Sequence, residues 1–268
     1  MIRNVLSIAG SDPSGGAGIQ ADLKTFSAQG VYGMAVLTAL TAQNTQGVTA
    51  IHVPPAGFVA DQLTAIFADI RVDAVKIGMI ADAGIAEAVA DVLGRQSVPW
   101  IVLDPVMVAK GGARLLPPHA VSVLKERLLP FSHLVTPNLA EAAALLDEPP
   151  ISARQHMPAL AERLATLGAG AVYLKGGHLD EDDSPDLLTA AGKATWIEGR
   201  RFATANTHGT GCTLSSALAA RLALGEPLET AARQAKAYVA AAIAASGALS
   251  VGHGHGPTHH FHALWPRE

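Results

Sequence analysis

The sequence has one cysteine, few charged residues and no long apolar segment. One cysteine can form neither an intrachain disulfide nor a cysteine-rich zinc site, and it suits a reducing cytoplasm. Charged residues make up 16% of the chain and include no basic block, which argues against nucleic acid as a partner. No stretch approaches the ~20 apolar residues of a membrane span, and residues 1–10 lack the pattern of a secretion signal. We therefore expect a cytoplasmic protein with no membrane partner.

The residues that are present favour a compact α/β protein. The chain has 268 residues, 49% of them hydrophobic, which is enough to bury a sizeable core. Short apolar runs typical of buried strands alternate with segments of helical spacing, and this predicts a mostly parallel sheet covered by helices. We find no linker or repeat and expect a single domain over residues 1–268. The predicted strands are Val5–Ala9, Met34–Leu40, Ala74–Met79, Trp100–Leu103, His133–Thr136 and Ala171–Leu174, with a hairpin of Asp186–Ala190 and Lys193–Ile197; the predicted helices are 18–29, 56–69, 82–94, 119–129, 138–147, 153–168, 211–224 and 228–246.

Five of the predicted strands are followed by glycine, proline or polar residues. Each of these residue types is an ordinary turn former, so one such strand end alone would indicate only a loop. Ligands of open α/β sheets bind beyond the carboxyl ends of the strands, and five such ends together favour a binding site. The five segments are Gly10-Ser11-Asp12, Gly78-Met79, Asp104-Pro105, Thr136-Pro137-Asn138 and Lys175-Gly176-Gly177.

Two glycine-rich loops lie directly before predicted helices. The first, residues 10–18 (GSDPSGGAG), lacks the Lys-Ser/Thr ending of a P-loop, which argues against a Walker-type NTPase. Residues 16–21 weakly match the dinucleotide-binding pattern G-x-G-x-x-A, so a dinucleotide-dependent oxidoreductase stays an alternative. The second loop, residues 209–212 (GTGC), can aim backbone N–H groups and a helix N-terminus at one anion. A plain glycine-rich helix start with a buried, inert cysteine is the other interpretation.

Cys212 ends the second glycine loop, where the helix begins. A cysteine at a helix N-terminus is expected to have a pKa below its usual value of about 8.5. The thiol could act as a nucleophile, or as a base that takes a proton from a substrate hydroxyl. The pattern alone does not choose between these roles.

Eight ordered motifs give the chain a specific resemblance over nearly its whole length. It resembles the bacterial hydroxymethylpyrimidine/phosphomethylpyrimidine kinases of thiamine synthesis, in the branch of the ribokinase-like superfamily that also holds pyridoxal kinases. The resemblance implies a central, mostly parallel sheet flanked by helices on both faces, and a homodimer. The motifs are AGSDPSGGAGIQADLKTFSA (9–28), TALTAQNTQGV (38–48), VKIGMI (75–80), VLDPVM (102–107), TPNLAEAAALL (136–146), LKGGH (174–178), NTHGTGCTLSSALAA (206–220) and GHGHGPTHHFH (252–262).

The resemblance also implies two reactions and their cofactors. ATP first phosphorylates 4-amino-5-hydroxymethyl-2-methylpyrimidine, and a second ATP converts the monophosphate to the diphosphate. Phosphoryl transfer depends mainly on positioning and charge neutralisation, with Mg²⁺ held by few carboxylates. The implied residues are Gly209 and Gly211 for the anion hole, Lys175 for the nucleotide phosphates, Asn138, Thr210 and Lys236 near the nucleotide, and Glu141 with Asp104 for Mg²⁺. Taken without the resemblance, Glu141 and Asp104 could be an ordinary first-turn carboxylate and a turn residue.

Gln43 has a chemical argument of its own. A carboxamide donates and accepts together, so it can pair with an amino group beside a ring nitrogen, as Gln does with adenine. An aminopyrimidine offers the same edge, and the resemblance gives the glutamine of TAQNT this task. The resemblance also implies that Met79 and Val106 pack on the ring and that Gly10 and Asp22 flank the hydroxymethyl end.

Cys212 stands where many members of the superfamily carry an aspartate base. The first nucleophile is an alcohol and needs a proton acceptor, whereas a phosphate monoester is already ionised near pH 7. We therefore expect Cys212, if it is the base, to matter far more for the first phosphorylation than for the second.

Several alternatives stay open. A pyridoxal or dual-substrate kinase is the nearest one, since pyridoxal also presents a hydroxymethyl group on a ring, and a non-catalytic binding protein is another. Residues 108–118 could close as a lid, because they contain a Gly-Gly pair. A histidine-rich segment near the C-terminus is expected to pack over a helix or a subunit contact rather than to bind a metal. Its histidines are His253, His255, His259, His260 and His262.

Overall fold

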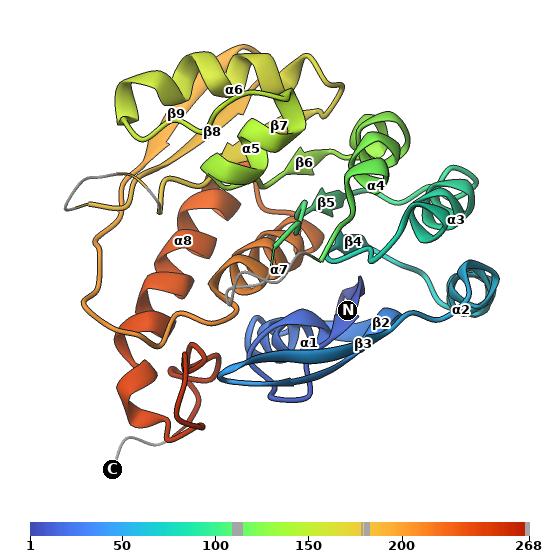
Figure 1. The fold of residues 1–268 in the computed structure, drawn as a ribbon, viewed down its shortest axis with the longest axis horizontal. Helices are drawn as coiled ribbons and strands as arrows, with labels where there is room; N and C mark the ends of the chain where they lie inside the picture. The colour runs from blue at the N-terminus through green and yellow to red at the C-terminus, as the bar shows by residue number, and fades with distance from the viewer. Residues whose placement is uncertain (109–114, 178, 180–182, 266–268) are drawn as a thin grey trace.

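The computed structural model describes residues 1–108, 115–177, 179 and 183–265. These residues form a nine-stranded sheet in the order β3-β2-β1-β4-β5-β6-β7-β8-β9 (Figure 1). The six central strands, β2, β1, β4, β5, β6 and β7, run parallel to one another. The edge strands β3, β8 and β9 pair antiparallel with their neighbours. The strands are β1 (Asn4–Ser11), β2 (Tyr32–Asn44), β3 (Gly47–His52), β4 (Ala74–Ile77), β5 (Ile101–Leu103), β6 (Leu134–Val135), β7 (Ala171–Leu174), β8 (Asp186–Ala190) and β9 (Lys193–Ile197).

Helices cover both faces of the sheet, as the resemblance implies (Figure 1). One face carries α2 (Ala56–Asp69), α3 (Ala83–Leu93), α4 (Pro118–Val123), α5 (Leu139–Leu146) and α6 (Met157–Ala165). The other face carries α1 (Gly18–Ala28), α7 (Thr210–Ala223) and α8 (Leu228–Ala244). In the described part of the chain, no helix combines the length and apolar character needed to cross a membrane.

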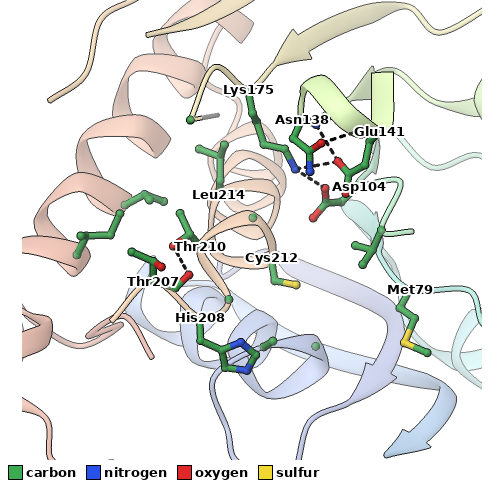
Figure 2. Close-up of a pocket in the computed structure, with 18 of the residues that line it drawn as sticks. Met79, Asp104, Asn138, Glu141, Lys175, Thr207, His208, Thr210, Cys212 and Leu214 are labelled. Carbon is green, nitrogen blue, oxygen red and sulfur yellow. Dashed lines mark hydrogen bonds and ion pairs between the residues drawn. The ribbon is translucent and has the colours of Figure 1, made fainter. Parts of the chain in front are cut away.

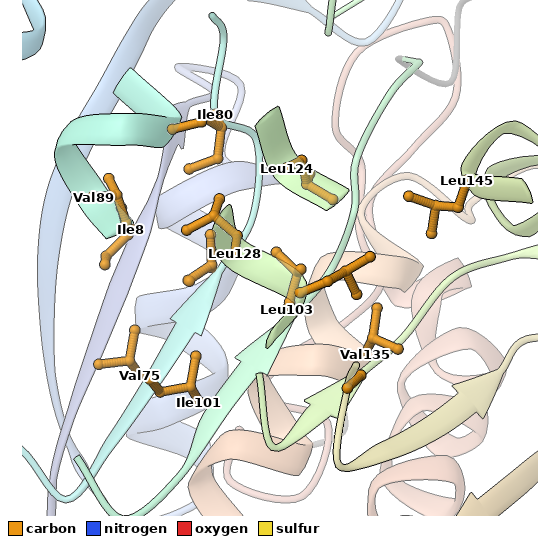
Figure 3. Packing of buried hydrophobic residues seen from close by; sticks show 14 of the residues in the cluster. Ile8, Val75, Ile80, Val89, Ile101, Leu103, Leu124, Leu128, Val135 and Leu145 are labelled. Carbon is orange, nitrogen blue, oxygen red and sulfur yellow. The ribbon is translucent and has the colours of Figure 1, made fainter. Parts of the chain in front are cut away.

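The central strands are mostly apolar because both of their faces are buried. Successive side chains of a strand point to opposite faces, so Val75 and Ile77 pack under α2 and α3 while Ala74 packs towards α7. Figure 3 shows the first of these layers, where Ile101 and Leu103 from β5 meet Leu128. This explains why short apolar runs predicted these strands.

Three elements differ from the sequence prediction. β2 extends to Asn44 and turns into β3, an edge strand that was not predicted because its residues are mostly exposed and lack a buried face. The helix predicted over 119–129 is α4 followed by a π-helical stretch, Leu124–Leu128.

The hairpin of β8 and β9 is confirmed, and Ala191 and Gly192 have the positive φ angles of a tight turn. Most of the segment considered as a lid, residues 109–114, lies outside the described residues.

The histidine-rich segment packs against α7 and α8, the turn between β2 and β3, and the second glycine loop. The backbone N–H of His255 donates to the carbonyl of Thr45 at 2.9 Å, and that of His208 donates to the carbonyl of Gly256 at 3.0 Å. His260 is buried against α7, with its Nε2 atom 3.0 Å from the hydroxyl of Thr213, and burial lowers its pKa to about 3. The expected packing over a helix is therefore confirmed. Within the described residues, no group of three or more His, Cys, Asp or Glu side chains is placed to hold a metal ion.

Candidate active site

A cavity of about 890 Å³ lies at the carboxyl ends of the parallel strands. All five strand ends singled out in the sequence contribute to its wall, and so do both glycine loops. The five ends meet because parallel strands present their carboxyl ends on the same edge of a sheet. The contributing residues from these ends are Gly10, Ser11, Asp12, Met79, Asp104, Asn138, Lys175 and Gly177. The interpretation that these loops build one site is consistent with this placement.

The two glycine loops touch each other at the centre of the cavity. Gly209 has a φ of +76°, in the left-handed region, and a Cβ atom at this position would overlap the carbonyl oxygen of Gly16. The carboxylate of Asp12 accepts the N–H of Ala17 at 2.8 Å and lies 2.8 Å from Nε2 of His208. One buried carboxylate thus folds the first loop and ties it to the second.

The first turn of α7 lies where the loops meet, at the place expected for the anion hole. Its N-cap residue is Gly209, which has no side chain to accept the N–H groups of the turn. The helix dipole adds partial positive charge at the same point. A Cβ atom built on Gly211 would lie 3.4 Å from Nζ of Lys175, so a full cation stands beside the first turn of α7. This arrangement suits a phosphate group.

Lys175 is held between two carboxylates (Figure 2). Its Nζ atom lies 2.8 Å from Asp104 and 3.6 Å from Glu141. Burial alone would lower the pKa of Lys175, but the two carboxylates raise it above its usual value, so the lysine stays charged. Burial raises the pKa of Glu141 to about 6 although Lys175 opposes this change. The cluster therefore keeps one cation fixed beside the first turn of α7.

Asp104 and Glu141 differ in the partners that their oxygens already have. Both oxygens of Asp104 accept protein hydrogen bonds, Oδ1 from Lys175 at 2.8 Å and Oδ2 from Ser215 at 3.1 Å. Glu141 forms a capping box with Asn138, in which each side chain accepts the backbone N–H of the other, at 2.8 and 2.9 Å. Glu141 is thus a first-turn carboxylate that caps its own helix, as the alternative interpretation expected. Glu141 also lines the cavity.

Cys212 lines the cavity, but the expected lowering of its pKa is wrong. Burial raises the pKa of the thiol to about 11, and the carboxylates of Asp22 and Asp104 add to this rise. Lys76 and the backbone N–H of Gly18 act in the opposite direction. The sequence argument counted the helix N-terminus and could not count the desolvation of the thiol.

Four of the five residues expected to contact the substrate ring line the cavity: Gly10, Gln43, Met79 and Val106. Asp22 does not. Its side chain is fully buried and pairs with Lys76 at 2.9 Å, so the expectation that Asp22 flanks the hydroxymethyl group needs correction. The sequence pattern shows that Asp22 lies in the first turns of α1, but it does not show whether the side chain points to the cavity or to the core.

The residues expected near the nucleotide also reach the cavity. Thr210 lies in the first turn of α7, where its hydroxyl donates to the carbonyl of Thr207 at 2.8 Å. Lys236 reaches the wall from α8 and is held by Asp186 at 2.7 Å and by the carbonyl of Ser184 at 2.6 Å. Asp186 also accepts the N–H of Gly176, so it fixes the turn after Lys175.

Sequence reasoning missed two parts of the site. His208 is buried between Asp12 and Gln43, with its Nε2 atom 3.4 Å from the amide nitrogen of Gln43. The sequence signal that could have identified His208 is its position directly before the GTGC loop. The other part is an apolar wall that Leu214 from α7 forms with Val239 and Ile243 from α8. These apolar residues look like any helix core residues in a sequence, so no pattern identifies them.

Comparison with known proteins agrees with this geometry. The sequence profile of the family described as phosphomethylpyrimidine kinase matches residues 12–259. The chain belongs to this family. The hydroxymethylpyrimidine/phosphomethylpyrimidine kinase of Escherichia coli is 52% identical over 98% of both chains. Family membership shows that the chain is a kinase enzyme, as the motifs indicated.

Solved structures place the fold in the same group. The phosphomethylpyrimidine kinase of Clostridium difficile is 40% identical, with a TM-score of 0.78 over 88% of this chain and 97% of the other. An ADP complex of Bacillus subtilis pyridoxal kinase is 36% identical, with a TM-score of 0.91 over 98% and 99%. The ribokinase-like fold is therefore confirmed, and both branches of vitamin kinases share it with this chain.

The contact between the glycine loops gives a test with a matched control. Gly209 and Gly30 both have a φ of +76°, but a Cβ atom at Gly30 meets nothing within 4 Å. Both alanine variants carry a left-handed strain of about 1–2 kcal/mol, and only Gly209→Ala must push the first loop away. We expect Gly209→Ala to lower kcat/KM of phosphoryl transfer by roughly a hundredfold, while folded Gly30→Ala keeps it. Equal activities of the two variants, measured by steady-state kinetics, would show that the loop contact is not needed.

Proposed function

We propose that this kinase uses ATP to phosphorylate 4-amino-5-hydroxymethyl-2-methylpyrimidine and then its monophosphate, in thiamine biosynthesis. The observation that supports this is the anion hole at the first turn of α7, with Met79 on one side and Leu214 on the other (Figure 2). One side suits a small ring and the other a nucleotide base, so the γ-phosphoryl group would lie between them. We place the reaction in the cytoplasm, where a free thiol stays reduced.

The anion hole supplies what phosphoryl transfer needs. The transferring group carries its charge on the equatorial oxygens, and fixed N–H donors with a cation stabilise this charge without reorganisation. The N–H groups after Gly209 and the ammonium of Lys175 have this arrangement. Lys236 lies further along the wall and would contact the nucleotide or the substrate phosphate.

Glu141 fits Mg²⁺ better than Asp104 does. Asp104 is 1% exposed and both of its oxygens have protein donors, so its task is to hold Lys175. Glu141 offers a carboxylate to the cavity, and a pKa raised to about 6 indicates a group that a cation would favour in its ionised form. Mg²⁺ is commonly held by one or two carboxylates and phosphate oxygens, and it would neutralise charge on the nucleotide. Asn138 would orient Glu141 through the capping box.

Gln43 is the residue that favours the aminopyrimidine over pyridoxal. Its Oε1 atom lies 3.3 Å from the hydroxyl of Thr41, and its amide nitrogen lies beside His208. The carboxamide is thus held at the cavity wall, where it can pair with an amino group and a ring nitrogen. Pyridoxal lacks that amino group. The likeness to a pyridoxal kinase structure keeps pyridoxal as the second candidate substrate.

A product assay tests the proposed function. The protein would be mixed with MgATP and hydroxymethylpyrimidine, with pyridoxal in parallel, and the products separated by chromatography. We expect the pyrimidine monophosphate first and the diphosphate after it. Transfer to pyridoxal alone would move the protein to the pyridoxal kinases, and no transfer to either ring would contradict the proposal.

The thiolate of Cys212 is proposed as the proton acceptor for the hydroxymethyl group. The alcohol must lose its proton as its oxygen bonds to phosphorus, whereas the monophosphate is already ionised near pH 7. We expect Cys212→Ala to slow the first phosphorylation about 10²-fold or more and the second by much less. Single-turnover rates of the two steps measure this ratio, and an equal loss in both would leave Cys212 with a structural role only.

We also propose a homodimer that forms through the β2–β3 hairpin. Leu40, Ala42 and Ala50 share one face of this hairpin and are exposed. Leu40 is 49% exposed although it extends an apolar strand. We expect a dimer in analytical ultracentrifugation and a monomer for Leu40→Asp, with Leu224→Asp as a control on the end of α7. A monomeric native protein would contradict the dimer.

A further inference from the structure

A lysine and an aspartate are fully buried beneath the active site. Lys76 on β4 and Asp22 on α1 are both 0% exposed, and Nζ of Lys76 lies 2.9 Å from each oxygen of Asp22. The hydroxyls of Ser7 and Ser216 donate to the same carboxylate at 2.6 and 2.7 Å. Packed apolar residues often stabilise a fold as well as a buried ion pair does, so stability alone does not account for these charges.

The ion pair is linked through Ser216 to the helix turn that carries Cys212. Cys212 and Ser216 are one turn apart on α7, and Gly18 and Asp22 are one turn apart on α1, so each pair shares one side of its helix. The backbone N–H of Gly18 faces the thiol of Cys212 and lowers its pKa, and the hydroxyl of Ser216 donates to Asp22. The two helices thus meet through two parallel contacts. Lys76 lies at the second contact, and it lines the same cavity as Cys212.

We infer that Lys76, held in place by Asp22, is a positioning residue for the first phosphorylation, because its ammonium stabilises the thiolate of Cys212. The inference rests on the proposed function, in which that thiolate accepts the proton of the substrate hydroxyl. The proton moves from the alcohol oxygen to sulfur while the oxygen bonds to phosphorus and ADP leaves. Lys76 keeps its own protons throughout and touches no reacting atom.

The charges around the thiol support this assignment. Lys76 from β4, Asp22 from α1 and Asp104 after β5 face Cys212, together with the N–H of Gly18. Burial of the thiol raises its pKa most, and Lys76 is the largest influence against that rise. Burial alone would also discharge Lys76, but Asp22 raises the pKa of the ammonium above its usual value. Asp22 is therefore needed to keep a cation under the thiol.

The chain offers a direct measurement, because Cys212 is its one cysteine. Iodoacetamide reacts with the thiolate, so its rate in the free protein, followed by intact mass spectrometry at a fixed neutral pH, reports on Cys212 alone. Each unit of rise in pKa lowers the thiolate fraction tenfold, while the more basic thiolate reacts about threefold faster. Loss of Lys76 should therefore slow alkylation by about threefold or more.

Three variants separate charge from packing. Lys76→Gln removes the cation, and the double variant Lys76→Gln/Asp22→Asn removes both charges so that no lone anion stays buried. Ser7→Ala is the control, because it removes a hydrogen bond to Asp22 and no charge. We expect slower alkylation in both Lys76 variants and an unchanged rate in Ser7→Ala. Unchanged alkylation in folded Lys76 variants would overturn the inference. Faster alkylation would also overturn it, because it would show that the substitution loosens the structure and exposes the thiol instead of raising its pKa.

The two phosphorylation rates complete the test. We expect both Lys76 variants to lose more in the first step than in the second, as Cys212→Ala does. Slow alkylation with equal losses in both steps would contradict a role in proton acceptance. Alkylation needs neither ATP nor pyrimidine, so absence of pyrimidine phosphorylation in the native protein would overturn the proposed function without altering the alkylation result.

Discussion

The contact between Gly209 and the carbonyl oxygen of Gly16 is the constraint on which the rest of the site depends. It allows two loops from opposite ends of the chain to meet without a side chain between them. Asp12 and His208 then fix their relative position by a buried hydrogen bond of 2.8 Å. Because the loops meet here, the first turn of α7 is open to an anion and stands beside Lys175. The anion hole is therefore a product of tertiary packing, although each loop is recognisable locally.

Much of the fold could be predicted because burial on both faces leaves a strong apolar signal. β1, β4 and β7 appear as short, mostly apolar runs, and the strand ends that follow them bear cavity residues. The hairpin of β8 and β9 carries a turn signal at Gly192. β3 was not predicted because it is an edge strand with an exposed surface. It is held in the sheet by pairing with β2, which its own residues do not reveal. Local patterns identify elements that are buried and miss those that depend on a neighbour.

The site was predicted less completely, because the sequence does not show the direction of a side chain or the desolvation of a titratable group. Asp22 lies in a motif of the family, yet it points inward to Lys76 and away from the cavity. Cys212 lies in the first turn of a helix, yet burial raises the pKa of its thiol. The apolar wall around Leu214 and Ile243 comes from two helices that meet only in the folded protein. Each of these facts needs three-dimensional neighbours.

The histidine-rich segment has a consequence for the order of folding. Thr45, at the turn between β2 and β3, bonds the N–H of Gly254, which lies 209 positions later in the chain. The carbonyl of Gly256 bonds His208 next to the second glycine loop. During synthesis the first loop leaves the ribosome before the segment that covers it. The last strand, β9, ends at Ile197, before this segment, so the nascent chain can complete its sheet before the two glycine loops are covered.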